Sequence, residues 1–330
     1  LSMSASNRAD RAWTESSEET SICLYPLPFG ENSAENFPIR LDRTYLCTLT
    51  LPMPVAQFTV NLLPGATELL AQQQSEMPQK NDLCGAFWVT LGLRTLGGLS
   101  VAQDDVGHEA WTVLSAVPDP TSLPPGESGR TDYVRSLPRI DDPAISGTSA
   151  HGLVRAVEEL AGDSLTTLAL SGTWTAANVG LLISGLGAID VPCIVTINSA
   201  TKHLWGASPR PTVVLNHLLT GEADGPPPDW DVGHFIGVLG WIDGPGGMLI
   251  ICADTYPGLG WRGIHVQRPA DIAVSLNRPD WQSDGGILIM LPRASAHEAK
   301  ELAKTLGLTE GIWDNGTPMV DPTTLEPWQP

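Results

Sequence analysis

The fold of this chain is most constrained by residues 234–257, which read HFIGVLGWIDGPGGMLIICADTYP. Two apolar runs of strand length flank a glycine-rich turn, a pattern typical of an antiparallel hairpin. If Asp243 belongs to the turn, Asp254 lies opposite Ile236 on the neighbouring strand. Because side chains alternate between the two faces of a strand, His234 and Asp254 are then diagonal neighbours on one face. A register shifted by one residue would separate them, so this prediction depends on the turn.

A helix that begins with a thiol is predicted over residues 84–96, within the stretch NDLCGAFWVTLGLRTLGG. Apolar residues follow Cys84 at helical spacing, and a Gly-Gly pair ends the pattern. In the first turn, Cys84 lies among backbone N–H groups without helical partners and at the positive end of the helix dipole, which favours the thiolate. An imidazole beside the thiolate and a carboxylate behind the imidazole complete a catalytic triad. We therefore expect Cys84, His234 and Asp254 to come together.

Each of these residues also has a purely structural explanation. Taken alone, Cys84 would be a small buried hydrophobe, His234 a half-buried histidine with satisfied hydrogen bonds, and Asp254 the start of a turn. Their combination favours catalysis, because Gln79 upstream of the thiol adds a side-chain donor for an oxyanion. The backbone N–H of Cys84 would be the second donor, and Gly85 would let a substrate approach the backbone.

The composition excludes several classes of function. A chain with 42% hydrophobic and 17% charged residues is typical of a globular protein, and its longest apolar runs are too short to span a membrane. A net charge of −19 argues against nucleic acid or an anionic membrane as a partner. Five scattered cysteines and a polar N-terminus without a signal peptide predict a cytoplasmic protein. We expect no metal and no cofactor, because no ligand spacing or phosphate-binding fingerprint is present.

Five regions are predicted from the distribution of apolar, proline and glycine residues. They are a disordered N-terminus (1–20), an N-terminal part of a catalytic core (21–115), a loop or lid with an inserted α/β region (116–230), an antiparallel sheet carrying His234 and Asp254 with a C-terminal helix (231–310), and a loose tail (311–330). A second helix is expected after Gly98, with Ser100 and Gln103 at capping-box spacing.

Other histidines and tryptophans are weaker candidates for a functional role. His108 and His265 have no convincing partner in the sequence pattern. Three of the tryptophans, Trp88, Trp241 and Trp261, are candidates for the border of a mostly apolar pocket.

Three motifs resemble those of known thiol enzymes. QKNDLCGAF, GHFIGVLGWID and IICADTYP are similar to the motifs of papain-like enzymes, especially the cysteine-peptidase and NlpC/P60-like branches. The following segment SVAQDDVGHEAW resembles the Dieckmann cyclases of hybrid polyketide–nonribosomal peptide pathways, of the tirandamycin and nocamycin type. The resemblance covers residues 74–110 and 230–257. It implies an α+β fold in which an N-terminal catalytic helix packs on an antiparallel sheet, with a large α/β insertion.

The resemblance also implies an activity in antibiotic biosynthesis. Such cyclases take a β-ketoacyl-aminoacyl group from the phosphopantetheine of an acyl or peptidyl carrier protein onto the catalytic cysteine. Carbon–carbon bond formation then releases a tetramic acid or a pyridone. A papain-like peptidase, amidase or thioesterase with the same triad is the first alternative, and a non-catalytic interaction protein on the same scaffold is the second.

The strand register and the family resemblance point to different catalytic acids. In the cyclases the triad follows the chain order Cys, Asp, His, which would make Asp104 or Asp105 the acid. The helix that starts at Cys84 is about 18 Å long, so an antiparallel helix after it would leave Asp104 about 10 Å or more from the thiol. Asp254 is therefore the preferred acid, and Asp104 is expected to stabilise its own helix.

Overall fold

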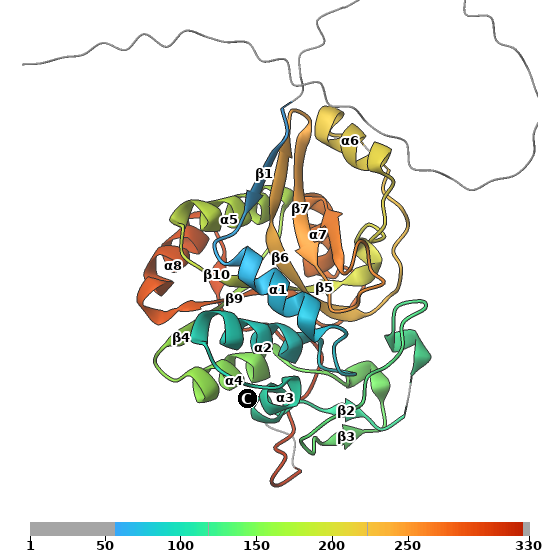
Figure 1. Ribbon diagram of the computed structural model, residues 1–330, viewed down its shortest axis with the longest axis vertical. Coiled ribbons are helices and arrows are strands. Elements are labelled where there is room, and N and C mark those ends of the chain that lie inside the picture. Colours follow the sequence, from blue (N-terminus) through green and yellow to red (C-terminus); the bar gives the residue numbers. More distant parts are fainter. Residues whose placement is uncertain (1–56, 118, 223, 326–330) are drawn as a thin grey trace, which may run out of the picture. The chain divides into compact units, whose positions relative to one another are not determined.

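The computed structural model describes residues 57–117, 119–222 and 224–325, all within one compact unit, Pro54–Pro330. In this part of the chain, eight α-helices surround a mostly antiparallel sheet (Figure 1). The predicted α+β class is confirmed. The predicted N-terminal region 1–20 lies outside the described residues.

The helices are α1 (Ala66–Glu76), α2 (Cys84–Gly97), α3 (Gln103–Glu109), α4 (Ala150–Ala161), α5 (Ala176–Ile189), α6 (Pro211–Thr220), α7 (Pro269–Asn277) and α8 (Ala296–Thr305). The strands are β1 (Thr59–Leu62), β2 (Leu114–Ser115), β3 (Arg139–Ile140), β4 (Leu165–Ser171), β5 (Ile194–Ala200), β6 (Gly233–Gly244), β7 (Gly247–Ala253), β8 (Ile264–Gln267), β9 (Gly286–Pro292) and β10 (Thr309–Glu310). None of the described helices is both long and apolar enough to cross a membrane.

The main sheet has the strand order β10-β4-β9-β5-β6-β7-β8, and β1 pairs with the far half of β6. Every residue of β5 is buried, because helices cover both faces of the sheet at this strand. Strands β4 and β5 come from the range 116–230, in which an insertion was expected. They pair with β9 and β6, so this range supplies central strands of the sheet rather than a separate region.

Helix α2 packs directly on the sheet, with contacts to β5, β6 and β9. Its apolar residues Phe87, Trp88 and Leu91 are fully buried. The indole nitrogen of Trp88 donates to the carbonyl oxygen of Phe235 on β6, at 2.9 Å. This bond fixes the rotation of α2 against β6, and therefore the direction in which Cys84 points.

The hairpin of β6 and β7 has the predicted register near His234 and Asp254, but its turn differs from the predicted one. Asp243 pairs with Met248 instead of joining the turn, which shifts the register by one residue. A β-bulge at Leu239 then adds one residue to β6, and Gly237 pairs with Ala253 beyond it. The bulge thus restores the register that brings His234 to Asp254, although the predicted turn was wrong.

The bulge depends on Gly240, where β1 crosses close to β6. Gly240 has a φ of 154°, and a Cβ at this position would lie 2.0 Å from the carbonyl oxygen of Asn61 and 2.8 Å from the Cα of Leu62. Both atoms belong to the backbone of β1 and cannot rotate away.

We expect Gly240→Ala to lower the free energy of unfolding by more than Gly98→Ala, as measured by urea denaturation. Gly98 also has a positive φ, 64°, but a Cβ there meets no atom within 4 Å. The control should cost about 1–2 kcal/mol of backbone strain. Gly240→Ala adds the collision with β1, and overpacking of this kind costs about 1–3 kcal/mol more. Equal losses in the two variants would contradict the argument.

Candidate active site

Cys84 is the first residue of α2 and is half-buried at the wall of a cavity of about 340 Å³. No acidic side chain occupies the first turn of the helix, so the backbone N–H groups there face the thiol without a competing carboxylate. The chain enters the helix through Asp82, which has a φ of 63°. The Asp82 carboxylate accepts hydrogen bonds from the backbone N–H of Ser115 at 2.9 Å and the hydroxyl of Ser146 at 3.1 Å.

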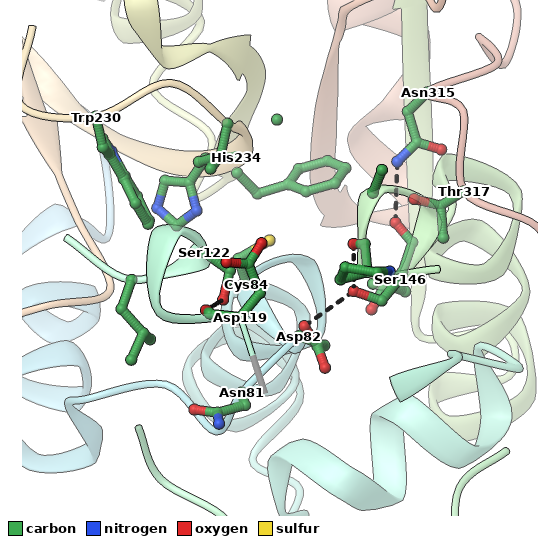
Figure 2. A pocket seen from close by; sticks show the side chains of 18 of the residues that line it. Asn81, Asp82, Cys84, Asp119, Ser122, Ser146, Trp230, His234, Asn315 and Thr317 are labelled. Carbon is green, nitrogen blue, oxygen red and sulfur yellow. Dashed lines mark hydrogen bonds between the residues drawn. The ribbon is translucent and has the colours of Figure 1, made fainter. Parts of the chain in front are cut away.

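The cavity wall is built from segments far apart in the sequence. Figure 2 shows His234 and Trp230 on one side of Cys84, with Asn315 and Thr317 on the other. The loops 119–123 and 143–148, from the range predicted as a lid, form further parts of the wall.

The predicted loose tail 311–330 is partly ordered against this cavity. The indole nitrogen of the buried Trp313 donates to the side-chain oxygen of Asn198 on β5, at 3.0 Å. The amide of Asn315 donates to the carbonyl oxygen of Thr148, at 3.1 Å. These bonds hold residues 313–317 at the site, which overturns the prediction for this stretch of the tail.

His234 and Asp254 form a buried pair at the ends of neighbouring strands. The Nε2 atom of His234 lies 3.1 Å from Oδ1 of Asp254, and the two residues are 2% and 3% exposed. The backbone N–H of Thr255 donates to the same oxygen at 2.7 Å. Trp230 packs edge-on against the imidazole, with 5.0 Å between the ring centroids. Two polar contacts and one aromatic contact therefore fix the orientation of the imidazole and the carboxylate.

The pair is charged at neutral pH. Burial alone would lower the pKa of His234, but the charge of Asp254 and hydrogen bonds with Asp254 and Cys84 raise it to about 10. Burial opposes the ionisation of Asp254 as well, yet the charge of His234 and hydrogen bonds from His234 and His265 hold its pKa well below the usual value. Since Nε2 of His234 faces Asp254, Nδ1 is left for the thiol. The structure therefore brings Cys84, His234 and Asp254 together, as predicted.

Gln79 lies in the cavity wall in a fixed orientation. Its side-chain oxygen accepts from the hydroxyl of Thr255 at 2.6 Å, and its backbone N–H donates to the carbonyl of Thr255 at 3.0 Å. With its oxygen engaged in this way, the amide nitrogen is the end of the side chain left to donate elsewhere. That Gln79 binds an oxyanion remains a prediction.

Gly85 has a different role from the one predicted. It does not border the cavity, and it is buried under α4 and β6. A Cβ at Gly85 would lie 2.8 Å from Cδ1 of Leu153 and 3.2 Å from the ring of Phe235. The glycine lets the start of α2 pack close to both elements, rather than exposing the backbone to a substrate.

Asp104 lies in a buried ion pair away from the cavity. Its carboxylate is fully buried, 2.5 Å from the ammonium of Lys80, and it accepts from the backbone N–H groups of Val134 and Arg135 at 2.5 and 2.6 Å. Burial opposes its ionisation, but the bonds from Lys80 and these N–H groups lower its pKa. Asp104 thus ties the loop after α1 to the segment at 134–135, and it does not contact His234 in the described structure.

Asp105 caps α3 instead of serving the thiol. Its carboxylate accepts from the backbone N–H of Ala102 at 3.0 Å, and α3 begins at Gln103. The predicted cap at Ser100 is therefore wrong, because the first turn starts two residues later and is closed by Asp105. Of the candidate acids, the structure places only Asp254 beside His234.

Two features of the site escaped the sequence analysis. His265, for which no partner was found, lies with Nε2 3.5 Å from Oδ2 of Asp254. The alternation in IHVQ at 264–267 is the signal that identifies its strand. The predicted aromatic border is also wrong: Trp88 and Trp241 are buried in the core, Trp261 is 72% exposed, and Trp230 and Trp281 line the cavity instead.

Comparison with known protein families gives one match. The model of a family of unknown function, DUF6885, matches residues 63–314, a span that contains Cys84, His234 and Asp254. The chain belongs to this family. None of the curated proteins matches it. The DUF6885 assignment attaches no activity to the cavity.

We expect Cys84 to be alkylated by iodoacetamide at neutral pH much faster than Cys193 or Cys252. Burial raises the pKa of both of these thiols, that of Cys193 to about 12, whereas Cys84 lies at the cavity beside an imidazolium. Peptide mass mapping over a time course measures the three rates. Equal labelling of Cys193 or Cys252 would contradict the assignment, and His234→Ala should slow the labelling of Cys84.

We expect Asp104→Ala to lower the free energy of unfolding by about 3–5 kcal/mol, because it leaves the charge of Lys80 buried without a partner. The control Asp105→Ala removes a cap, which is worth about 0.5–2 kcal/mol. Urea denaturation gives both values. Alkylation of Cys84 in the folded protein should keep its wild-type rate in both variants. Loss of labelling in folded Asp104→Ala would mean that Asp104 acts on the thiol after all.

Proposed function

We propose that this chain is a cysteine-dependent Dieckmann cyclase. It takes a β-ketoacyl-aminoacyl group from the phosphopantetheine of an acyl or peptidyl carrier protein and closes it to a tetramic acid or pyridone. The observation that supports this most is the placement of Cys84 in the first turn of α2, beside the buried pair of His234 and Asp254. A helix carrying the thiol, packed on an antiparallel sheet carrying the histidine and the acid, also supports a papain-like core.

The first half of the reaction transfers the acyl group. The Cys84 thiolate attacks the carrier thioester, and backbone N–H groups of the first turn of α2 with the amide of Gln79 stabilise the oxyanion. The carbon–sulfur bond to phosphopantetheine then breaks. The imidazolium of His234 gives its proton to the departing thiolate, which leaves a neutral imidazole beside the new Cys84 thioester.

The second half closes the ring. Neutral His234 takes a proton from the carbon between the two carbonyls of the β-ketoamide, and Asp254 stabilises the imidazolium that forms again. The carbanion attacks the Cys84 thioester, the carbon–carbon bond forms, and the thiolate leaves. Each proton given up in the first half is recovered in the second, so no external acid, base or nucleotide is consumed.

A buried cation in the cavity wall suits the negative charge of this carbanion. Arg278 is 2% exposed, and no carboxylate lies within ion-pair distance of it in the described chain. Burial lowers its pKa to about 10, so it stays charged at neutral pH. Its guanidinium donates to the side-chain oxygen of Asn198 at 2.7 Å, and a Cβ at Gly233, next to His234, would lie 3.9 Å from the guanidinium.

A thioesterase, peptidase or amidase would use the same three residues, with water as the second acceptor. Cyclisation requires that water be kept from the Cys84 thioester, and the rings of Trp230, Phe235 and Tyr256 supply apolar parts of the cavity wall. A volume of about 340 Å³ fits one acyl-aminoacyl chain, since ligand pockets span about 300–1,000 Å³. The product distinguishes the two reactions, because cyclisation gives a tetramic acid or pyridone and hydrolysis gives a free acid.

We expect the wild type to convert a β-ketoacyl-aminoacyl pantetheine thioester to a tetramic acid, without added metal or nucleotide. Cys84→Ala and His234→Ala should fall to background, because the acyl acceptor or the base is lost. Asp254→Asn should lose up to about 10⁴-fold in rate, as removal of the orienting carboxylate does in a comparable triad. Liquid chromatography with mass spectrometry measures the product.

Asp104→Asn and Asp105→Asn are the matched controls and should stay active at temperatures where they are folded. An inactive, folded Asp104→Asn with an active Asp254→Asn would assign the acid to α3. A free acid as the main product would replace the cyclase proposal with a hydrolase.

A further inference from the structure

His265 lies behind the proposed catalytic acid, on the side opposite His234. It belongs to β8, where it pairs with Cys252 of β7, and it is 6% exposed. Its Nε2 atom is 3.5 Å from Oδ2 of Asp254, at the outer limit of a hydrogen bond. The two carboxylate oxygens therefore face different histidines: Oδ1 faces His234 and Oδ2 faces His265.

The donors to Asp254 are distributed unequally. Besides His234, the backbone N–H of Thr255 donates to Oδ1 at 2.7 Å, whereas the hydroxyl of Thr255 donates to Gln79. Within the described chain, His265 is the residue that approaches Oδ2. Without it, a buried carboxylate oxygen would have no donor, and the carboxylate could rotate away from His234.

The tautomer of His265 is set by Gln267. The side-chain oxygen of Gln267 accepts from the backbone N–H of Trp205 at 2.8 Å, and its nitrogen donates to the carbonyl of Trp205 at 2.9 Å. A flipped amide would place donor against donor and acceptor against acceptor, so its orientation is fixed. The same nitrogen lies 3.1 Å from Nδ1 of His265.

Because the Gln267 nitrogen donates to it, Nδ1 of His265 carries no proton. The proton of neutral His265 is then on Nε2, which faces Asp254. Two backbone groups of Trp205 thus determine, through Gln267, that His265 presents a donor to the carboxylate.

We propose that His265 is a positioning residue for the reaction, held in the Nε2–H tautomer by Gln267 so that it occupies Oδ2 of Asp254 and leaves Oδ1 to His234. This inference rests on the proposed catalytic role of Cys84, His234 and Asp254. The titratable groups around His265 are Cys252 of β7, Asp254 directly after that strand, and Asp229, which borders the same small space behind the triad.

The test compares His265→Leu, which keeps apolar volume but removes the donor, with His265→Gln, whose amide nitrogen can reach the same oxygen. The readout is the rate of Cys84 alkylation by iodoacetamide between pH 5 and pH 10. We expect His265→Leu to be slower by about 10-fold or more at neutral pH, as when a residue that orients a functional histidine is lost. Its profile should move to higher pH, because a misplaced Asp254 stabilises the His234 imidazolium less. His265→Gln should stay close to the wild type.

His203→Leu is the matched control, since it removes a histidine 3.0 Å from a carboxylate, that of Asp280, outside the cavity. It should leave the profile unchanged. Gln267→Met keeps His265 but releases its tautomer, and we expect a smaller shift in the direction of His265→Leu. Circular dichroism confirms that each variant is folded.

An unchanged rate and profile in folded His265→Leu would overturn the inference, as would equal losses in His265→Leu and His265→Gln without a shift in pH. Slow labelling of Cys84 in the wild type itself would be a separate result. It would contradict the proposed function and not the role of His265.

Discussion

The buried contact between His234 and Asp254 is the interaction on which the proposed chemistry depends. Two opposite charges that are 2% and 3% exposed stay ionised only because each has the other and additional hydrogen bonds. The raised pKa of His234 contributes stability fully below the unfolded value of about 6.5, and this contribution is lost as the pH rises through about 10. The lowered pKa of Asp254 contributes above its unfolded value of about 3.9 and is lost in acid. The pair is therefore most stabilising between about pH 3.9 and pH 6.5, and part of this stabilisation is already lost at neutral pH.

The contact between His234 and Asp254 exists because a β-bulge in β6 compensates for the short turn between β6 and β7. The tight turn would place His234 and Asp254 on opposite faces, and the bulge at Leu239 shifts the register back. The bulge in turn requires a glycine at 240, because a Cβ there would collide with the backbone of β1, which pairs with β6 at this residue. A feature of the N-terminal strand thus helps to set the geometry of two residues much further along the chain.

Features set by local sequence patterns could be predicted, whereas features set by contacts between distant segments could not. The apolar runs, the glycine-rich turn and the helix that starts at Cys84 follow from local patterns, and they were sufficient to propose the triad. The bulge could not be predicted, because it results from contact with a strand far away in the sequence. His265 was missed for a similar reason: its strand is only four residues long, and its partners come from β7 and from the segment at Trp205. The sequence predicts an insertion over the range 116–230, because buried strands do not reveal which sheet they join.

The thiol is placed relative to the pair by the segment that joins α1 to α2. Gln73, at the end of α1, donates to the backbone carbonyl of Asp254 at 2.8 Å. Gln79 exchanges a backbone and a side-chain hydrogen bond with Thr255. The residues just before Cys84 are thus bonded to the residues just after β7, and α2 is bonded to β6 through Trp88. Cys84, His234 and Asp254 come from three elements that are tied to one another on each side of the site. A displacement of any one element therefore has to break a buried hydrogen bond, which costs about 1–3 kcal/mol. These ties keep the thiol beside the imidazole, which has to give and then take a proton in the proposed reaction.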